Sequence, residues 1–249
     1  MMNGVKWMNA TQMNDAIYEL KQNIYDEIHH RILWKYTDKP VLKDEQLFFL
    51  LLPFLNGENY DETMRKNVIS VGIVHASLDE HEKIKETSSN DKVQQLTVLS
   101  GDYYSGLYYE MLAKGGNISL IQALSIGIIN RCEQQIKLYE PEILTMERFA
   151  TLVEVVESEL ITQFYTTIEQ SQYVDIAKCA LTIIELQKIM SQDAKSHLKT
   201  IFARVQQEGT NILELKQLIE ARKQHLQQLL ADSSLNEECM KTIEKYCLS

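Results

Sequence analysis

Three side chains capable of acid–base or metal chemistry share one face of a helical pattern. His75, Asp79 and Glu82 follow one another at steps of four and three residues, which places an imidazole and two carboxylates on one side of a helix. Such a set can begin a metal site, but a di-iron bundle needs Glu-x-x-His pairs on two further helices, which this chain does not supply. The favoured interpretation is a partly buried His75 beside a solvated acidic edge, and a catalytic or ligand site is the alternative. His29-His30 is interpreted in the same way, as a solvated helix end.

The common short motifs of catalysis are missing from the sequence. There is no Gly-x-Ser-x-Gly elbow and no P-loop. The segment Leu99-Ser100-Gly101-Asp102 is not a dinucleotide fingerprint, because no β-α-β pattern surrounds it. Tyr104 and Tyr108 are spaced to stack together on a ligand, although aromatic residues at this spacing more often form a packed helix face. The residues by themselves name no activity.

Composition and charge exclude several classes of partner. The chain has 249 residues and a formal net charge of −10, so no basic face is expected to attract nucleic acid or an anionic membrane surface. The longest apolar run, Leu47–Leu52, is too short to cross a bilayer, and the first ten residues lack the apolar core of a signal peptide. Four widely spaced cysteines fit reduced, mostly buried thiols. We therefore expect a cytoplasmic protein without a transmembrane segment.

Apolar residues recur every three or four positions almost throughout the chain, and strand-like alternation is missing. The pattern predicts an all-α helical bundle of about ten helices, in a single domain over 1–249 because no linker-like tract divides it. The first helix is predicted to end near Tyr36. Capping boxes are predicted at Asn59 with Glu62 and at Ser119 with Gln122, at the starts of two long helices.

Around Gly101-Asp102 the sequence resembles the trans-polyprenyl diphosphate synthases. In that all-α family, which has the isoprenoid synthase fold, one helix ends in Ser-Leu-x-x-Asp-Asp-x-x-Asp, and the helix after the next loop opens with Gly-Asp-Tyr/Phe-Leu. The matching residues here are Ser77-Leu78, Leu99, Gly101-Asp102-Tyr103 and Leu112-Ala113. The phrases LDEHEKI and QLTVLSGDYYSGLYYEMLA are similar to a subgroup, the small subunits (component 1) of bacterial two-component heptaprenyl diphosphate synthases. The strong similarity covers about 71–139.

The chain departs from the family where catalysis needs metal ligands. The positions of Asp-Asp-x-x-Asp hold His81 and Glu82 and, after two residues, Lys85, so one carboxylate remains and a cation replaces another. The family needs carboxylates there because Mg²⁺ bridges them to the allylic diphosphate. No adjacent Asp-Asp pair occurs anywhere, and only Asp38-Lys39-Pro40 lies near the expected place of the Gly-Gly-Lys-x-x-Arg segment for isopentenyl diphosphate. The resemblance therefore implies no metal or cofactor on this chain and no catalytic residue of its own, with Mg²⁺ held by the partner.

The implied function is that of a non-catalytic, obligatory subunit of a heterodimeric prenyltransferase. The complete enzyme would extend farnesyl diphosphate with isopentenyl diphosphate to a heptaprenyl chain for the menaquinone side chain. Its catalytic large subunit, component 2, would be the partner, and the isoprenoid diphosphates would be met only through the complex. The alternatives are an all-α enzyme in its own right, with His75, Asp79 and Glu82 as a site, and a helical regulatory or adaptor protein.

The resemblance also implies roles for two sets of apolar residues. The helix opened by Gly-Asp and the helix that follows it form much of the family's subunit interface. The residues expected at the partner interface are Tyr103, Tyr104, Tyr108, Met111, Ile121, Leu124, Ile128 and Cys132. A wall of the tunnel for the growing prenyl chain is expected at Gly72, Ile73, Ala76 and Ser77. The alternative for the first set is an intramolecular core, and for the second set ordinary packing of helices.

Overall fold

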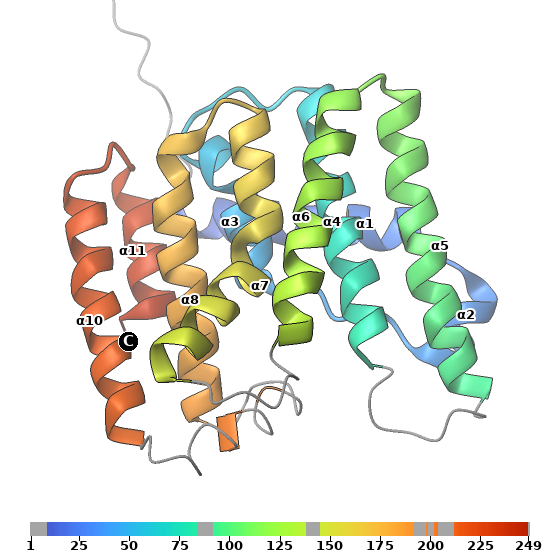
Figure 1. Cartoon of the computed structure of the whole chain (residues 1–249). Coiled ribbons are helices and arrows are strands. Elements are labelled where there is room, and N and C mark those ends of the chain that lie inside the picture. Colours follow the sequence, from blue (N-terminus) through green and yellow to red (C-terminus); the bar gives the residue numbers. More distant parts are fainter. Residues whose placement is uncertain are drawn as a thin grey trace, which may run out of the picture. The chain divides into compact units, whose positions relative to one another are not determined.

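The computed structural model describes residues 9–83, 92–137, 145–191, 198, 202–203 and 212–248. These residues form ten α-helices and a short 3-10 helix, and they contain no β-strand (Figure 1). The all-α class predicted from the apolar spacing is confirmed. The elements are α1 (Ala10–Ile28), α2 (Arg31–Thr37), α3 (Asp44–Leu55), α4 (Glu62–Glu82), α5 (Lys92–Lys114), α6 (Ile118–Lys137), α7 (Met146–Thr167), η2 (Ser171–Tyr173), α8 (Val174–Met190), α10 (Ile212–Ala231) and α11 (Glu237–Cys247).

Residue contacts divide the chain into two compact units, Met1–Gln122 and Ala123–Ser249. Unit 1 contains α1 to α5 and the first turn of α6, and unit 2 contains the rest of α6 together with α7 to α11. Each unit is described by itself below. The prediction that both belong to one domain remains a prediction.

Unit 1 is built around the packing of α4 against α5. Helix α1 packs on α3 and α4, and α2 packs on α5. The face of α1 that the apolar spacing predicts is buried, and it consists of Met13, Ile17, Leu20, Ile24 and Ile28. In the middle of α4, Gly72 permits close approach of α1, because a Cβ at this position would lie 2.3 Å from Cδ1 of Ile24. The core of unit 1 therefore depends on one glycine at a helix crossing.

The first helix ends eight residues earlier than Tyr36, the end that its spacing predicts. Helix α1 stops at Ile28, because His29 leaves the helical region with φ −59° and ψ 121°. His30 then caps α2, since its Nδ1 accepts a hydrogen bond of 3.2 Å from the backbone N–H of Leu33. Apolar residues continue at helical spacing across this break. The sequence pattern therefore does not show that the chain changes direction at His29.

Two predicted helix caps are also displaced. Asp61, not Asn59, caps α4 by accepting a hydrogen bond of 2.8 Å from Met64 N–H. At the start of α6, the side chain of Asn117 accepts from Leu120 N–H at 3.1 Å, in place of the predicted cap at Ser119. Asp and Asn are at least as good as the predicted residues at this position, so neighbouring candidates compete within two residues.

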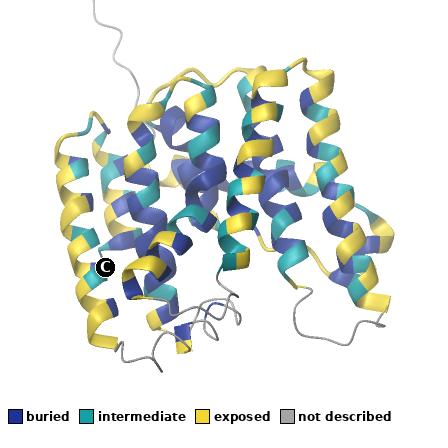
Figure 2. Ribbon diagram, in the orientation of Figure 1, coloured by how far each residue is buried: buried dark blue, intermediate teal, exposed yellow. Residues whose placement is uncertain are grey.

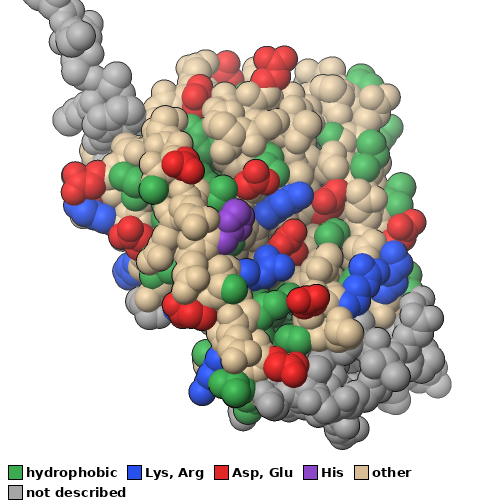
Figure 3. Space-filling view, turned by 60° about the vertical axis from the view of Figure 1, so that its left-hand side comes forward, with side chains coloured by type: hydrophobic (Ala, Val, Ile, Leu, Met, Phe, Trp, Pro, Cys, Tyr) green, Lys and Arg blue, Asp and Glu red, His purple; other side chains and the backbone are tan. Residues whose placement is uncertain are grey.

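Unit 2 is built around α7 and α8, and α10 and α11 pack on α8. Figure 2 shows α7 and α8 buried along much of their length, whereas α10 is largely exposed. The apolar spacing predicts one stripe of Phe149, Leu152, Val156, Leu160, Phe164 and Ile168. The first five are buried in α7, and Ile168 is half-buried just beyond its end. On the side that carries α10, acidic and basic side chains are interspersed (Figure 3), as on a solvated helix surface. An ion pair of 2.7 Å joins Arg222 in α10 to Glu154 in α7.

None of the helices in the described residues combines the length and the apolar character that a membrane span requires. All four cysteines lie in the described residues, and none forms a disulfide. Cys179, Cys239 and Cys247 are buried, and Cys132 is half-buried. The predicted reduced and mostly buried thiols agree with this arrangement.

Candidate functional site

The Ser-Leu and Gly-Asp elements of the sequence meet at the crossing of α4 and α5. The Oγ of Ser77 in α4 donates a hydrogen bond of 2.8 Å to the carbonyl oxygen of Gly101 in α5. The same Oγ lies 2.8 Å from the Oγ of Ser105, one helical turn further along α5. Small side chains and two polar contacts let the helix backbones approach closely. The two elements therefore serve as one packing interface, whether or not the chain performs chemistry.

His81 lies directly on Gly101. A Cβ at residue 101 would lie 2.5 Å from His81 Nε2, so only glycine leaves room for this ring position. The same Nε2 is 3.6 Å from Oδ1 of Asp102, which is longer than a hydrogen bond, and the Asp102 side chain is exposed. An imidazole thus occupies the first position where the synthase motif would place an aspartate.

The remaining motif positions do not supply a metal site in the described residues. Glu82 is half-buried at the end of α4, and Lys85 lies outside the described residues. The described part of the chain holds no group of three or more His, Cys, Asp or Glu side chains that could bind a metal ion. His75 is buried, as expected in part, but Asp79 is buried too, so the prediction of a solvated acidic edge was wrong for Asp79. The described geometry gives the alternative of a His75–Asp79–Glu82 metal site no support.

Glu80 is a buried carboxylate that the spacing of His75, Asp79 and Glu82 did not single out. Its side chain is fully buried, and one carboxylate oxygen forms an ion pair with Lys83 Nζ one turn later. Burial raises the pKa of Glu80 above its ordinary value of 4.5, and the hydrogen bond from Lys83 opposes part of that rise. The folded chain therefore binds a proton at Glu80 more tightly than the unfolded chain does.

Replacing Glu80 with glutamine should change the pH dependence of stability. Because the pKa is raised in the folded state, the stability that Glu80 contributes is fully present below pH 4.5 and is lost as the pH rises through the folded pKa. Glu80→Gln removes this titration. The stability of the variant minus that of the unmodified chain should therefore increase as the pH rises from 4 to 7. Thermal unfolding of both proteins across this range measures the change. A difference that is constant with pH would contradict the assignment.

Tyr104 and Tyr108 are interior residues of unit 1. Tyr104 has no exposed surface, and its hydroxyl accepts a hydrogen bond of 3.0 Å from Trp34 Nε1 in α2. Burial raises the pKa of Tyr104 to about 12. Tyr108 is 8% exposed, whereas the adjacent Tyr109 is 55% exposed. The packed-face alternative therefore describes Tyr104 and Tyr108 in this chain, and Tyr109 is the most exposed tyrosine of α5.

The other residues predicted for the interface differ in accessibility. Leu124 is fully buried, and five are half-buried: Tyr103, Met111, Ile121, Ile128 and Cys132. The more exposed apolar residues of α6 lie about a quarter-turn further round the helix. We call Ile126, Ile129 and Ile136 the α6 isoleucine face; they are 51%, 56% and 64% exposed. Their spacing of three and seven residues was a readable signal for a shared face, but it could not show which face is exposed.

All four residues predicted for the tunnel wall are buried in unit 1. Gly72 and Ser77 are used at helix crossings, the first against Ile24 and the second against Gly101. Ile73 and Ala76 have no exposed surface. The structure thus gives the first two residues a packing role, and a tunnel role remains a prediction.

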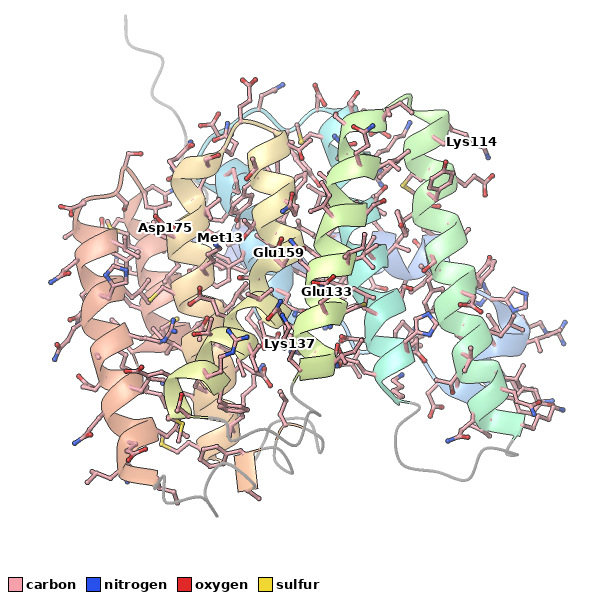
Figure 4. The ribbon with its side chains drawn as sticks, in the orientation of Figure 1. Met13, Lys114, Glu133, Lys137, Glu159 and Asp175 are labelled. Atoms are coloured by element: carbon pink, nitrogen blue, oxygen red, sulfur yellow. The ribbon has the colours of Figure 1, made fainter. Side chains whose placement is uncertain are left out.

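Unit 2 contains polar groups that the sequence motifs did not indicate. The carboxylate of Glu159 in α7, which is labelled in Figure 4, accepts hydrogen bonds from Asn130 of α6 at 2.7 Å and from Gln163 at 2.9 Å. Glu157 and Glu185 are also buried, and Lys188 Nζ lies 3.8 Å from the carboxylate of Glu185. Isolated Glu residues within apolar helices carry no motif spacing, so only the fold shows that they are buried.

The sequence was compared with known protein families and curated proteins. Residues 30–235 match the family described as heptaprenyl diphosphate synthase (HEPPP synthase) subunit 1. Heptaprenyl diphosphate synthase component 1 of Geobacillus stearothermophilus is 30% identical over 127 residues. That alignment covers 51% of this chain and 57% of the relative, so it spans little more than half of either protein.

Two solved structures with a similar fold are polyprenyl synthases. Geranylgeranyl pyrophosphate synthase of Lactobacillus brevis superposes with a TM-score of 0.69 at 12% identity, over 96% of this chain and 97% of that chain. Heptaprenyl diphosphate synthase of Staphylococcus aureus superposes with a TM-score of 0.59 at 15% identity, over 98% and 86% of the two chains. Identities this low establish the fold alone. They confirm the isoprenoid synthase fold that the Gly-Asp resemblance implied.

Proposed function

Because the chain belongs to the heptaprenyl diphosphate synthase subunit 1 family, we propose that it is the non-catalytic, obligatory subunit of a heterodimeric prenyltransferase. The observation that carries the proposal is the crossing of α4 and α5. There the packing elements are retained, while His81 lies where the synthase motif would place a metal-binding aspartate. The chain thus has the helix packing of the synthases but lacks an aspartate at this position of their metal-binding motif.

The catalytic partner would supply the aspartates and the Mg²⁺. Mg²⁺ binds carboxylate oxygens and stabilises the charge on a leaving diphosphate, and this chain offers no comparable set in its described residues. The complete enzyme would join isopentenyl diphosphate to farnesyl diphosphate, in the cytoplasm, and give the heptaprenyl chain of menaquinone. The contribution of this chain would be to hold the partner in its active shape, and the tunnel-wall residues would add control of product length.

The α6 isoleucine face is the best candidate for contact with the partner. Its three large aliphatic side chains are each more than half exposed, which is costly in water, and exposed apolar surface of this kind marks interaction sites. The half-buried Ile128 and Cys132 of the original prediction border this face. Tyr109 offers a further exposed aromatic contact on α5.

Thiol labelling tests this assignment without any substitution. Burial raises the pKa of Cys179 to about 11 and the pKa values of Cys239 and Cys247 to about 12, so their reactive thiolates are scarce at neutral pH. Cys132 alone should therefore react readily in the folded chain, as located by mass spectrometry. Adding the catalytic subunit should slow the labelling of Cys132 at least tenfold. Unchanged labelling within a complex verified by size-exclusion chromatography would move the interface away from this side of α6.

A further inference from the structure

A basic pocket lies at the junction of α1 and α2 in unit 1. Its volume is about 580 Å³, and it is lined by His29, His30, Arg31, Ile32 and Lys35. Four of these five side chains are basic, although the chain as a whole carries a net charge of −10. The exposed carboxylates of Asp26 and Glu27, one turn earlier, are not among the lining groups. The local charge of the pocket therefore opposes that of the protein around it.

The imidazole of His30 is held by groups outside the pocket. Its Nδ1 accepts the hydrogen bond from Leu33 N–H, so in the neutral ring the proton resides on Nε2, which is left as a donor. The ring also packs edge-on against Tyr103 in α5, with ring centroids 5.2 Å apart. A contact from each of two helices thus fixes the orientation of this donor.

The imidazole of His29 is held in a similar way. Its ring packs edge-on against Trp34, with centroids 4.8 Å apart. Trp34 is in turn anchored, because its indole N–H donates to the buried hydroxyl of Tyr104. This part of the pocket wall therefore rests on the core of unit 1, and it needs little reorganisation to receive a ligand.

Arg31 and Lys35 complete the wall with two permanent cations. They are four residues apart in α2, so their side chains lie on the same side of the helix. Both are exposed, and among the described residues neither takes part in an ion pair. A guanidinium presents paired N–H donors that match the oxygens of a phosphoryl group, and the ammonium adds a second positive charge.

We propose that this pocket binds a phosphoryl oxyanion, either inorganic phosphate or the diphosphate group of a larger molecule. Two imidazoles, a guanidinium and an ammonium line it, with the Lys35 ammonium also 5.7 Å from the centroid of the Tyr36 ring, and its volume accommodates a diphosphate. The site follows from these side chains and does not depend on the proposed subunit function.

Fluorescence of Trp34 can report on binding in the full chain. The chain has two tryptophans, so Trp7→Phe leaves Trp34, beside His29, as the single emitter. Titration with inorganic phosphate and, separately, with pyrophosphate should give a saturable change in emission. Isothermal titration calorimetry on the unmodified chain checks that the reporter substitution has not created the effect. Tighter binding of pyrophosphate would identify a diphosphate site, and equal binding per molecule would identify a phosphate site.

Charge-neutralising variants decide whether the pocket is responsible. Arg31→Gln and Lys35→Gln should each weaken binding about tenfold, the usual effect of losing one charged hydrogen bond. Lys66→Gln is the matched control, because Lys66 is an exposed helical lysine of unit 1 that lies away from the pocket and 3.8 Å from Glu62. Weaker binding by the Arg31→Gln and Lys35→Gln chains, together with unchanged binding by the Lys66→Gln chain, supports the proposal. The absence of saturable binding, or equal weakening by all three variants, would overturn it.

Discussion

Replacing Tyr104 with alanine is expected to lower the free energy of unfolding of the isolated chain by about 3–5 kcal/mol. The ring has no exposed surface, so its removal leaves a cavity between α2, α4 and α5. The substitution also deprives Trp34 Nε1 of its acceptor. Tyr104→Phe, which removes only the hydroxyl, should cost about 1–3 kcal/mol. Denaturant unfolding, followed by circular dichroism, measures both changes.

Tyr109→Ala is the matched control, because Tyr109 lies in the same helix and is 55% exposed. It should change the free energy of unfolding by no more than about 0.5 kcal/mol, while weakening assembly with the catalytic subunit. If Tyr104→Ala left the isolated chain as stable as before and removed only assembly, Tyr104 would be an interface residue. The packing described here would then be wrong.

Replacing Ile129 with glutamate is expected to prevent stable assembly with the catalytic subunit. Ile129 is central in the α6 isoleucine face and is 56% exposed, so the isolated chain should tolerate the charge. In the complex the carboxylate would be buried without a partner, which is strongly unfavourable. Truncation of a central interface residue costs about 2–4 kcal/mol, or roughly 30- to 1000-fold in affinity, and a buried charge should reach the upper part of that range.

Ile212→Glu provides the comparison for this variant. Ile212 is also an exposed helical isoleucine of unit 2, 50% exposed at the start of α10. The Ile212→Glu substitution should leave assembly unchanged. Co-purification with the catalytic subunit and measurement of the affinity compare the two variants. Equal loss of affinity in the two variants would show a general effect of surface charge. Full assembly of the Ile129→Glu chain would exclude this face of α6 from the interface.

The helical class and much of the core could be predicted from the sequence, because both depend on local spacing. The buried face of α1 and the stripe on α7 follow from apolar residues at steps of three and four. The Gly-Asp element could be recognised because it resembles a local motif of the synthases, and in this chain glycine at residue 101 also leaves room for the ring of His81. At these positions the local sequence pattern and the tertiary packing require the same residue types.

Accessibility and changes of direction could not be predicted in the same way. Tyr104 and Tyr109 are both tyrosines of one helix, and the positions of α2 and α4 decide that the first is buried. The apolar residues of α6 extend over more than one face, so the sequence does not say which face remains exposed. The break at His29 interrupts no apolar period, and so the basic pocket formed beyond it was not foreseen.

The central claim is that this chain is required for prenyl elongation but does not perform it. The most direct measurement is a Mg²⁺-dependent assay with farnesyl and isopentenyl diphosphates on three samples: this chain alone, the catalytic subunit alone and the mixture. The account predicts product from the mixture only. Turnover by this chain alone would contradict it and favour the independent-enzyme alternative. Full activity of the catalytic subunit without this chain, with no complex formed, would contradict it in favour of a regulatory or adaptor protein.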